Sequence, residues 1–211
     1  MVYISYKDGD FKWKSACLAL MNFNRKWKGL APLYGAGVRL RSFAYEYGIL
    51  PGFDVPGIKV CCVGNLRSGG TGKTPVTIFV AQYLKNKGIP VAVIHRGYKG
   101  EREFTGGLVS DGEQILLTAS EAGDEAMLLA QALPGVPVLC GADRVEQVRN
   151  ARALGARVAL LDDGFQHLRL NRDLNILLVH PDDLSGHSDL LPAGPLREPV
   201  SAISRADLLA G

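Results

Sequence analysis

The stretch IKVCCV at residues 58–63, followed by GGTGKT at residues 69–74, determines the fold that we expect for this chain. An apolar run of this length is typical of a buried strand, and apolar side chains recur at helical spacing after Lys73. A glycine-rich turn between a strand and a helix is the context of a phosphate-binding loop. The sequence therefore predicts a nucleoside triphosphate-binding α/β protein.

Each part of this loop has a chemical role. Small residues let backbone N–H groups converge on phosphates, a lysine reaches the β and γ oxygens, and a hydroxyl coordinates Mg²⁺. Arg67 stands where the usual pattern has its first glycine, so we expect Gly69 and Gly70 to supply the positive-φ turns. The alternative is a glycine-rich turn that ends in Gly-Lys-Thr by chance. The predicted ATP contacts are Gly69, Gly70, Thr71, Gly72, Lys73 and Thr74, with Thr74 also on Mg²⁺.

Composition and charge narrow the class of protein. The chain has 211 residues, of which 47% are hydrophobic and 21% charged, so it has the composition of a globular protein. Its net charge is +3, and residues 1–50 are the basic part. No stretch reaches the roughly 18 apolar residues that cross a bilayer, and the apolar run 16–21 is short for a signal peptide. The four cysteines, which lack metal-ligand spacing, indicate a reduced, cytosolic setting: Cys17, Cys61, Cys62 and Cys140.

After residue 57 the chain alternates strand-like and helix-like segments at the spacing of a parallel α/β sheet. We expect one P-loop NTPase-like core over residues 53–211, with a mostly parallel sheet flanked by helices. The expected strands lie near 58–63, 90–95, 136–140, 157–161 and 174–180, and the expected helices cover 73–86, 124–133 and 142–154.

Residues 1–52 form a different kind of segment, basic and amphipathic. A helix over 33–47 would place Arg39, Ser42 and Glu46 opposite one apolar face, and Trp13 and Trp27 lie upstream among basic residues. This pattern suits an interfacial membrane helix, but it also suits a helix that packs its apolar face on the sheet. A nucleic-acid arm is the weaker third reading because no base-reading motif accompanies it. The apolar face would consist of Leu33, Ala36, Gly37, Leu40, Phe43, Ala44 and Tyr47.

Carboxylates follow the apolar run 158–161. Asp162 is the candidate for Mg²⁺, directly or through water, and Asp163 with Gly164 is either part of the site or an ordinary turn. Asp124 and Glu125 open a helix, where they either complement the helix dipole or provide a metal ligand beside a base for an attacking hydroxyl. The cluster from His95 to Gly100 is a further candidate site, which either binds a phosphate of the acceptor or is merely a polar loop.

Five motifs together resemble the tetraacyldisaccharide 4'-kinase family, the lipid A 4'-kinases, and they occur in order from about Trp27 to the end. They are VGNLRSGGTGKTP (63–75), HRGY (95–98), GDE (123–125), LLDDGFQH (160–167) and LLPAGPLREP (190–199). The resemblance implies transfer of the ATP γ-phosphoryl group to the 4'-hydroxyl of a tetraacylated glucosamine disaccharide 1-phosphate. It places the reaction at the cytoplasmic leaflet of a Gram-negative inner membrane, with the chain peripheral to it. No nucleic acid and no protein partner is indicated.

The resemblance also assigns residue roles. It implies that Lys73 and Thr74 contact ATP and Mg²⁺, that Asp124 is the catalytic base, and that Glu125 and Asp162 are metal-associated carboxylates. The residues it implies for shaping the active site or contacting the acceptor are Asp163, Gln166, His167, Arg96, Tyr98 and Arg197.

The chain departs from the family pattern in several places. His95 and Lys99 replace small residues around Arg-Gly-Tyr, Ala126 replaces a proline, and residues 1–24 look like an extension. The resemblance implies a further segment after Gly211 that completes a second lobe and supplies a histidine partner for the catalytic aspartate. Two other functions remain open: a P-loop ATPase or GTPase switch, and a nucleotide-binding remnant without catalysis.

Overall fold

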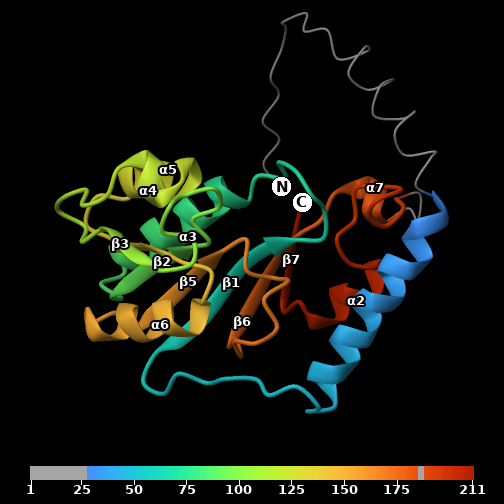
Figure 1. Cartoon of the computed structure of the whole chain (residues 1–211). Coiled ribbons are helices and arrows are strands. Elements are labelled where there is room, and N and C mark those ends of the chain that lie inside the picture. The colour runs from blue at the N-terminus through green and yellow to red at the C-terminus, as the bar shows by residue number, and fades with distance from the viewer. Residues whose placement is uncertain (1–27, 185–187) are drawn as a thin grey trace, which may run out of the picture.

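The structure, a computed structural model, describes residues 28–184 and 188–211. Its centre is a seven-stranded sheet in the order β3-β4-β2-β5-β1-β6-β7 (Figure 1). Every pairing is parallel except the antiparallel pairing of β3 with β4. The predicted fold class, a mostly parallel α/β sheet flanked by helices, is confirmed. The strands are β1 Lys59–Asn65, β2 Val91–His95, β3 Gly107–Ser110, β4 Val138–Cys140, β5 Val158–Asp162, β6 Leu174–Leu178 and β7 Leu208–Ala210.

Helices cover both faces of the sheet, with α3, α4 and α5 above it and α6 below it in Figure 1. Two apolar clusters fill the two layers. The upper cluster includes Ala81 and Leu129, and the lower one includes Val148 and Phe165. The helical segments are η1 Lys28–Leu30, α2 Ala31–Glu46, α3 Lys73–Asn86, α4 Ala119–Ala122, α5 Asp124–Ala132, α6 Arg144–Ala153, α7 Pro181–Leu184 and η2 Val200–Arg205.

The five predicted strands and the predicted core helices are all present, with small shifts at their ends. β4 begins after Pro137, which has no N–H to donate to the sheet. α6 begins at Arg144 because the Asp143 side chain accepts a hydrogen bond from the backbone N–H of Glu146 at 3.2 Å. The two edge strands were not predicted. β3 has only four residues and an irregular register, and β7 has only three, so neither carries a clear period-two pattern.

Cys61 and Cys62 lie on β1 and point to opposite faces of the sheet, as their adjacency predicts. Cys62 is fully buried in the lower cluster, whereas Cys61 packs against the upper one. With Cys140 they are free thiols, and burial raises the pKa of each of the three. Cys17, Trp13 and Trp27 lie outside the described residues.

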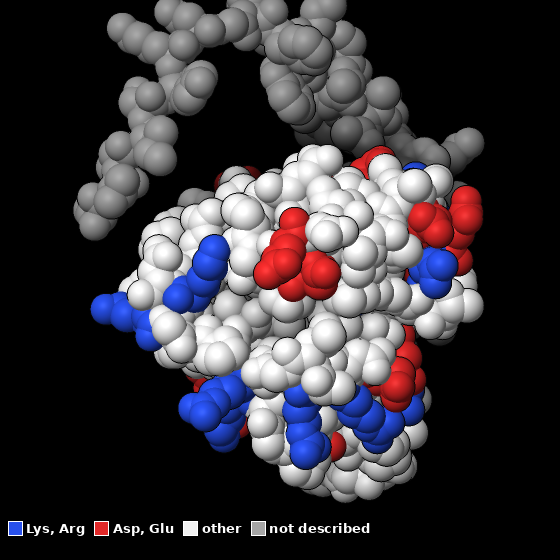
Figure 2. Space-filling view, turned by 90° about the vertical axis from the view of Figure 1, so that its left-hand side faces the viewer, with Lys and Arg blue, Asp and Glu red and all other residues white. Residues whose placement is uncertain are grey.

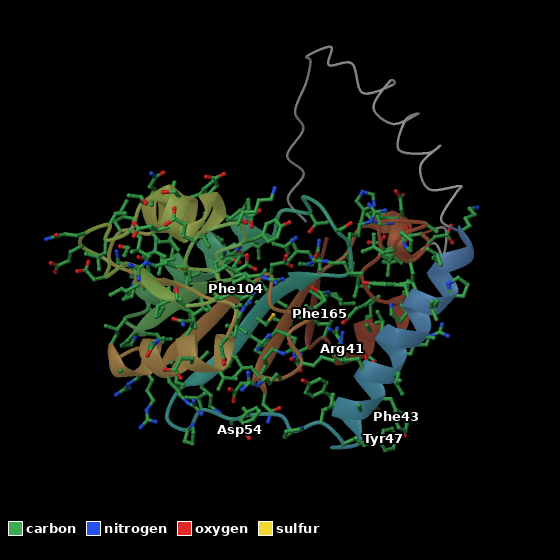
Figure 3. All side chains as sticks on the ribbon, viewed as in Figure 1. Arg41, Phe43, Tyr47, Asp54, Phe104 and Phe165 are labelled. Carbon is green, nitrogen blue, oxygen red and sulfur yellow. The ribbon has the colours of Figure 1, made fainter. Side chains whose placement is uncertain are left out.

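Of the three readings of the N-terminal segment, helix α2 contradicts the one in which the predicted apolar face packs on the sheet. Leu33 and Leu40 are about 70% exposed, at 72% and 69%, and Phe43 and Tyr47 are also exposed. The helix instead docks through its other side, where Gly35 is buried against Leu190. In Figure 3, Phe43 and Tyr47 lie on the outer side of α2, whereas Arg41 points toward the domain.

The described part of the chain contains no helix that combines the length and the apolar character needed to span a membrane. Figure 2 shows the face of the molecule that carries β3, α4, α5 and α6. Lys and Arg side chains gather at its lower part, where α6 lies in Figure 1, with acidic side chains between them. This face is therefore of mixed charge.

Candidate functional site

The candidate site lies at the carboxyl ends of β2, β5 and β1, which are consecutive in the sheet. The register pairs Val63 on β1 with Asp162 on β5, and β5 pairs with β2 on its other side. Asn65, Asp162 and His95 therefore end three neighbouring strands. In open α/β sheets this edge is where ligands bind.

The loop after β1 has the conformation of a phosphate-binding turn, with one correction to the prediction. Gly69 and Gly72 have positive φ angles of 113° and 83°, whereas Gly70 is not among the positive-φ glycines. The turn is therefore made by Gly69 and Gly72, not by Gly69 and Gly70. Arg67 is compatible with the loop because its side chain points to α7, where its Nε lies 2.8 Å from the buried Asp183 carboxylate.

The cationic and hydroxyl groups of the loop face two carboxylates. Lys73 Nζ lies 3.8 Å from Asp163 Oδ1 and donates to the carbonyl oxygen of Gly69 at 3.3 Å. Thr74 Oγ1 donates to Asp162 Oδ2 at 3.4 Å, and Thr77 Oγ1 donates to Asp162 Oδ1 at 2.8 Å. Burial raises the pKa of Asp162, against the lowering effects of His95 and the Thr77 hydrogen bond. The structure thus confirms that β5 delivers Asp162 to the start of the P-loop helix.

Arg197 joins the far segment LPAGPLREP to this site. Its guanidinium donates two hydrogen bonds to Asp163, at 3.1 and 2.8 Å, and a third to Asn65 Oδ1 at 2.6 Å. A fourth, from Nε, goes to the backbone carbonyl of Arg67 at 2.9 Å. Asn65 in turn donates to Thr71 Oγ1 at 2.6 Å. Arg197 and Asp163 therefore fix the shape of the loop, and charge-assisted bidentate bonds of this kind are strong.

These groups surround a cavity of about 1090 Å³. It is lined by every predicted loop residue, by all six predicted acceptor-side residues and by Glu125. Asp162 does not line the cavity itself but accepts a hydrogen bond from Thr74, which does. The lining residues are Arg41, Ser68, Gly69, Gly70, Thr71, Gly72, Lys73, Thr74, Pro75, His95, Arg96, Tyr98, Glu125, Ala142, Arg144, Asp163, Gln166, His167 and Arg197.

Asp124 and Glu125 are the first two residues of α5, but only Glu125 lines the cavity. Asp124, at the N-terminal end of the helix, is exposed and does not line the cavity. Glu125 Oε2 lies 2.9 Å from His95 Nε2, and this hydrogen bond lowers the pKa of Glu125. The role of Asp124 as a base remains a prediction.

The loop after β2 brings Arg96 and Tyr98 to the opposite wall of the cavity. Arg96 Nε donates to the buried Glu103 at 2.6 Å, and Glu103 also accepts from the backbone N–H of Lys99. Gly97 has a φ of 69° and packs closely on Cys140 and Ala122, so a side chain there would be strained. The loop is thereby held against the start of α5.

His167 and Arg144 both line this cavity, and of the two only Arg144 carries a positive charge at neutral pH. Burial, followed by the charges of Arg144 and Arg172, lowers the pKa of His167 to about 4. Burial also lowers the pKa of Arg144 to about 10. The Nε atom of Arg144 and the Nε2 atom of His167 are buried without a hydrogen-bond partner among the described residues. Buried polar atoms without a partner are uncommon in folded proteins, and both of these belong to residues that line the cavity.

The low pKa of His167 predicts a pH-dependent stability. The unfolded chain binds a proton at His167 near its ordinary pKa of 6.5, whereas the folded chain does so only near 4. The free energy of unfolding should therefore fall as the pH falls from 6.5 to 4, by less than about 1.4 kcal/mol per pH unit. Urea unfolding at a series of pH values should show a shallower fall in His167→Gln than in the wild type. Identical slopes for both proteins would contradict this assignment.

A P-loop implies a bound Mg²⁺ ion, and the residues of this site can be compared with what that ion needs. Within residues 28–184 and 188–211, no group of three or more His, Cys, Asp and Glu side chains is arranged to hold a metal ion by itself. Mg²⁺ in nucleotide sites needs only one or two carboxylates, because waters and phosphate oxygens complete its shell. The Thr74 hydroxyl and the Asp162 carboxylate already lie within 3.4 Å of one another, and they provide the oxygen donors that Mg²⁺ prefers. The residues present therefore fit the ion.

The sequence did not single out three residues of the site. Asn65 connects Arg197, Thr71 and, through its carbonyl, Gln166 at 2.8 Å. Its signal was a polar residue directly after an apolar strand. Arg144 follows an N-cap aspartate and looked like an ordinary first-turn residue. Arg41, on α2, reaches the cavity from a segment far away in the sequence.

Comparison with known proteins places the chain in a family. The pattern of tetraacyldisaccharide-1-P 4'-kinase (LpxK) matches residues 27–210. The tetraacyldisaccharide 4'-kinases of Syntrophus aciditrophicus and Geobacter sulfurreducens are 47% and 49% identical, over 83% and 85% of this chain. Those alignments cover 47% and 51% of the two relatives, so the chain spans about half the length of the curated relatives it matches.

A solved structure gives the same result. It is described as the "apo" form of LpxK from Aquifex aeolicus in complex with ATP, and it is 39% identical with a TM-score of 0.82. The match covers 88% of this chain and 57% of that one. The shared pattern, sequence identity and fold lead to one conclusion: the chain belongs to the tetraacyldisaccharide-1-P 4'-kinase family.

Proposed function

We propose that this chain supplies the nucleotide-binding and phosphoryl-transfer part of an ATP-dependent kinase of lipid A biosynthesis. The acceptor is the 4'-hydroxyl of a tetraacyldisaccharide 1-phosphate, the substrate class that the names of the relatives give for those proteins. One observation carries the proposal: Lys73, Thr74 and Glu125 line a single cavity, and the buried Asp162 carboxylate lies 3.4 Å from the Thr74 hydroxyl. Phosphoryl transfer depends mostly on positioning and charge neutralisation, which this arrangement supplies.

In this proposal each residue acts on a definable atom. Lys73 moves from its present partners to the β and γ oxygens of ATP, while the backbone N–H groups of the loop hold the phosphates. Thr74 and Asp162, with Glu125 at the cavity wall, would hold Mg²⁺. When bound, Mg²⁺ neutralises charge on the β and γ phosphates. Asp124 accepts the proton of the attacking hydroxyl.

On the acceptor side, Arg96, Tyr98, Gln166 and His167 provide contacts from two walls of the cavity. Arg197 and Asp163 support these contacts by fixing the loop. Arg144 adds a buried positive charge to the same corner, and a guanidinium suits the phosphate of a sugar 1-phosphate.

Transfer of radiolabel from γ-labelled ATP tests this proposal. The kinase predicts label on the tetraacyldisaccharide 1-phosphate and a dependence on that acceptor. Label released only as free phosphate would favour a P-loop ATPase switch. Tight ATP binding with neither product would favour a nucleotide-binding part that is inactive without the remainder found in its relatives.

We further propose that α2 lies on the cytoplasmic leaflet of the inner membrane. The support is the unpacked apolar face of this helix, which begins at Leu33 and ends with the stacked rings of Phe43 and Tyr47, 4.2 Å apart. Burying such a face in the interfacial region of a bilayer is favourable at about 25 cal/mol per Å² of apolar surface. The reading of α2 as a membrane-surface helix therefore has structural support that the pattern alone lacked.

Charge placed on this face should weaken vesicle binding. We expect the Leu40→Glu/Phe43→Glu variant to bind phosphatidylglycerol-containing vesicles at least about tenfold more weakly than the wild type, because both side chains would leave the bilayer. Sedimentation with vesicles measures the bound fraction. The control is Phe79→Glu, which changes an aromatic residue on α3 that is 68% exposed, compared with 48% for Phe43. Equal loss in both variants, or no loss in either, would contradict the assignment.

A further inference from the structure

We propose that His95 is a positioning residue that orients the carboxylate of Glu125 toward the nucleotide cavity. It occupies the last position of β2 and is only 3% exposed, whereas the Glu125 side chain is 67% exposed. A buried, fixed ring thus holds an exposed and otherwise mobile carboxylate. The inference rests on the proposed function because Glu125 acts there as a metal-associated group.

Two contacts fix the ring and its tautomer. The backbone N–H of Gly97 donates to His95 Nδ1 at 3.0 Å, so this nitrogen carries no proton. The proton of the neutral ring is therefore on Nε2, which lies 2.9 Å from Glu125 Oε2 and donates to it. The backbone is held as well, because the carbonyl of His95 accepts from the N–H of Gly141.

The consequence concerns which oxygen of Glu125 remains free. Oε2 accepts the hydrogen bond from His95 and Glu125 lines the cavity, so we infer that Oε1 is the oxygen available to a metal ion. A histidine or other donor that orients a ligating carboxylate in this way is the usual outer shell of a metal site, and its loss typically costs 10- to 100-fold in metal affinity. His95 and Asp162 end the neighbouring parallel strands β2 and β5, so the ring lies at the same edge of the sheet as the buried carboxylate of the proposed Mg²⁺ site.

Substitutions that separate the two ring nitrogens test the inference. The side-chain amide of Gln reaches the position of Nε2 and keeps a donor for Glu125, whereas the amide of Asn reaches only the position of Nδ1. We would measure ATP binding by calorimetry with Mg²⁺ and with EDTA. Mg²⁺ should raise the ATP affinity of the wild type at least about tenfold more than it raises that of His95→Asn. The ATP affinity measured in EDTA should be the same in both proteins. His95→Gln should restore most of the gain.

Two controls separate positioning from packing. Cys140→Ala disturbs the packing of the same loop, since Cys140 lies against Gly97, and it should keep the Mg²⁺ gain. The double variant His95→Asn/Glu125→Ala should be no weaker than Glu125→Ala, because both changes remove one interaction. Equal weakening in His95→Asn and His95→Gln, or equal weakening with and without Mg²⁺, would overturn the inference.

A readout without nucleotide completes the test. The ¹⁵N shifts of the His95 ring in the free protein should show a protonated Nε2 and an unprotonated Nδ1, and the opposite tautomer would overturn the inference. If the wild type bound ATP with no gain from Mg²⁺, the inference would fail while the nucleotide site would stand. If the wild type bound no ATP, the proposed function would fail, and the ring shifts would still decide the bond to Glu125.

Discussion

Lys73→Ala should weaken the binding of Mg²⁺·ATP by about 10- to 100-fold and reduce phosphoryl transfer further. The residue is only 12% exposed in its side chain and lies at the cavity, so its loss removes a charge-assisted hydrogen bond worth about 1.5–3 kcal/mol. The effect on transfer should be larger, because charge on the γ phosphate grows in the transition state. Calorimetry and γ-label transfer measure the two effects separately.

The fold should survive this change. Asp163, the carboxylate beside Lys73, keeps both hydrogen bonds from Arg197 when the lysine is removed. The control is Lys87→Ala, which removes an exposed lysine after the end of the same helix. A Lys73→Ala protein that binds Mg²⁺·ATP as tightly as the Lys87→Ala protein would show that the triphosphate does not occupy this loop.

Asp124→Asn should leave the binding of Mg²⁺·ATP within the range of the wild type and lower the rate of transfer by about 10²- to 10⁴-fold, the usual contribution of a general base. Its side chain is exposed beside the cavity and does not line it, so nucleotide contacts should not depend on it. Glu125→Gln, the matched change at the next residue, should instead weaken the part of ATP binding that depends on Mg²⁺. Single-turnover transfer and calorimetry give the two quantities.

The reverse pattern would reassign the two acids. If Asp124→Asn weakened nucleotide binding and left turnover intact, Asp124 would be a ligand and not a base. If Glu125→Gln lowered the rate alone, Glu125 would be the better candidate for the base, since it is the one that lines the cavity.

The core of the fold could be predicted from the sequence because its signals are local. The run before Gly69 is apolar enough to require a strand buried on both faces, and the loop and helix follow within a few residues. Asp162 was predictable for the same reason, since a carboxylate directly after a parallel strand must lie at the ligand-binding edge. The neighbouring register of Val63 and Asp162 bears this out.

What the sequence could not give depends on contacts between distant segments. Nothing local indicates that Arg197 binds Asn65, 132 residues away, or that Arg41 on α2 reaches the cavity. The exposure of Leu33 and Leu40 could not be predicted either, because an amphipathic pattern does not show whether the apolar face packs on the protein or stays exposed. The choice between Gly70 and Gly72 for the turn required backbone angles.

A crystal structure of the chain with a non-hydrolysable ATP analogue and Mg²⁺ tests the central claim most directly. We expect the triphosphate on the loop from Gly69 to Thr74, with the metal held by Thr74 and Asp162. The opposite edge of the sheet offers a second cavity of about 520 Å³, lined by Asp54, Lys59 and Arg157 among others. Nucleotide bound in that second cavity, with the loop empty, would contradict the account.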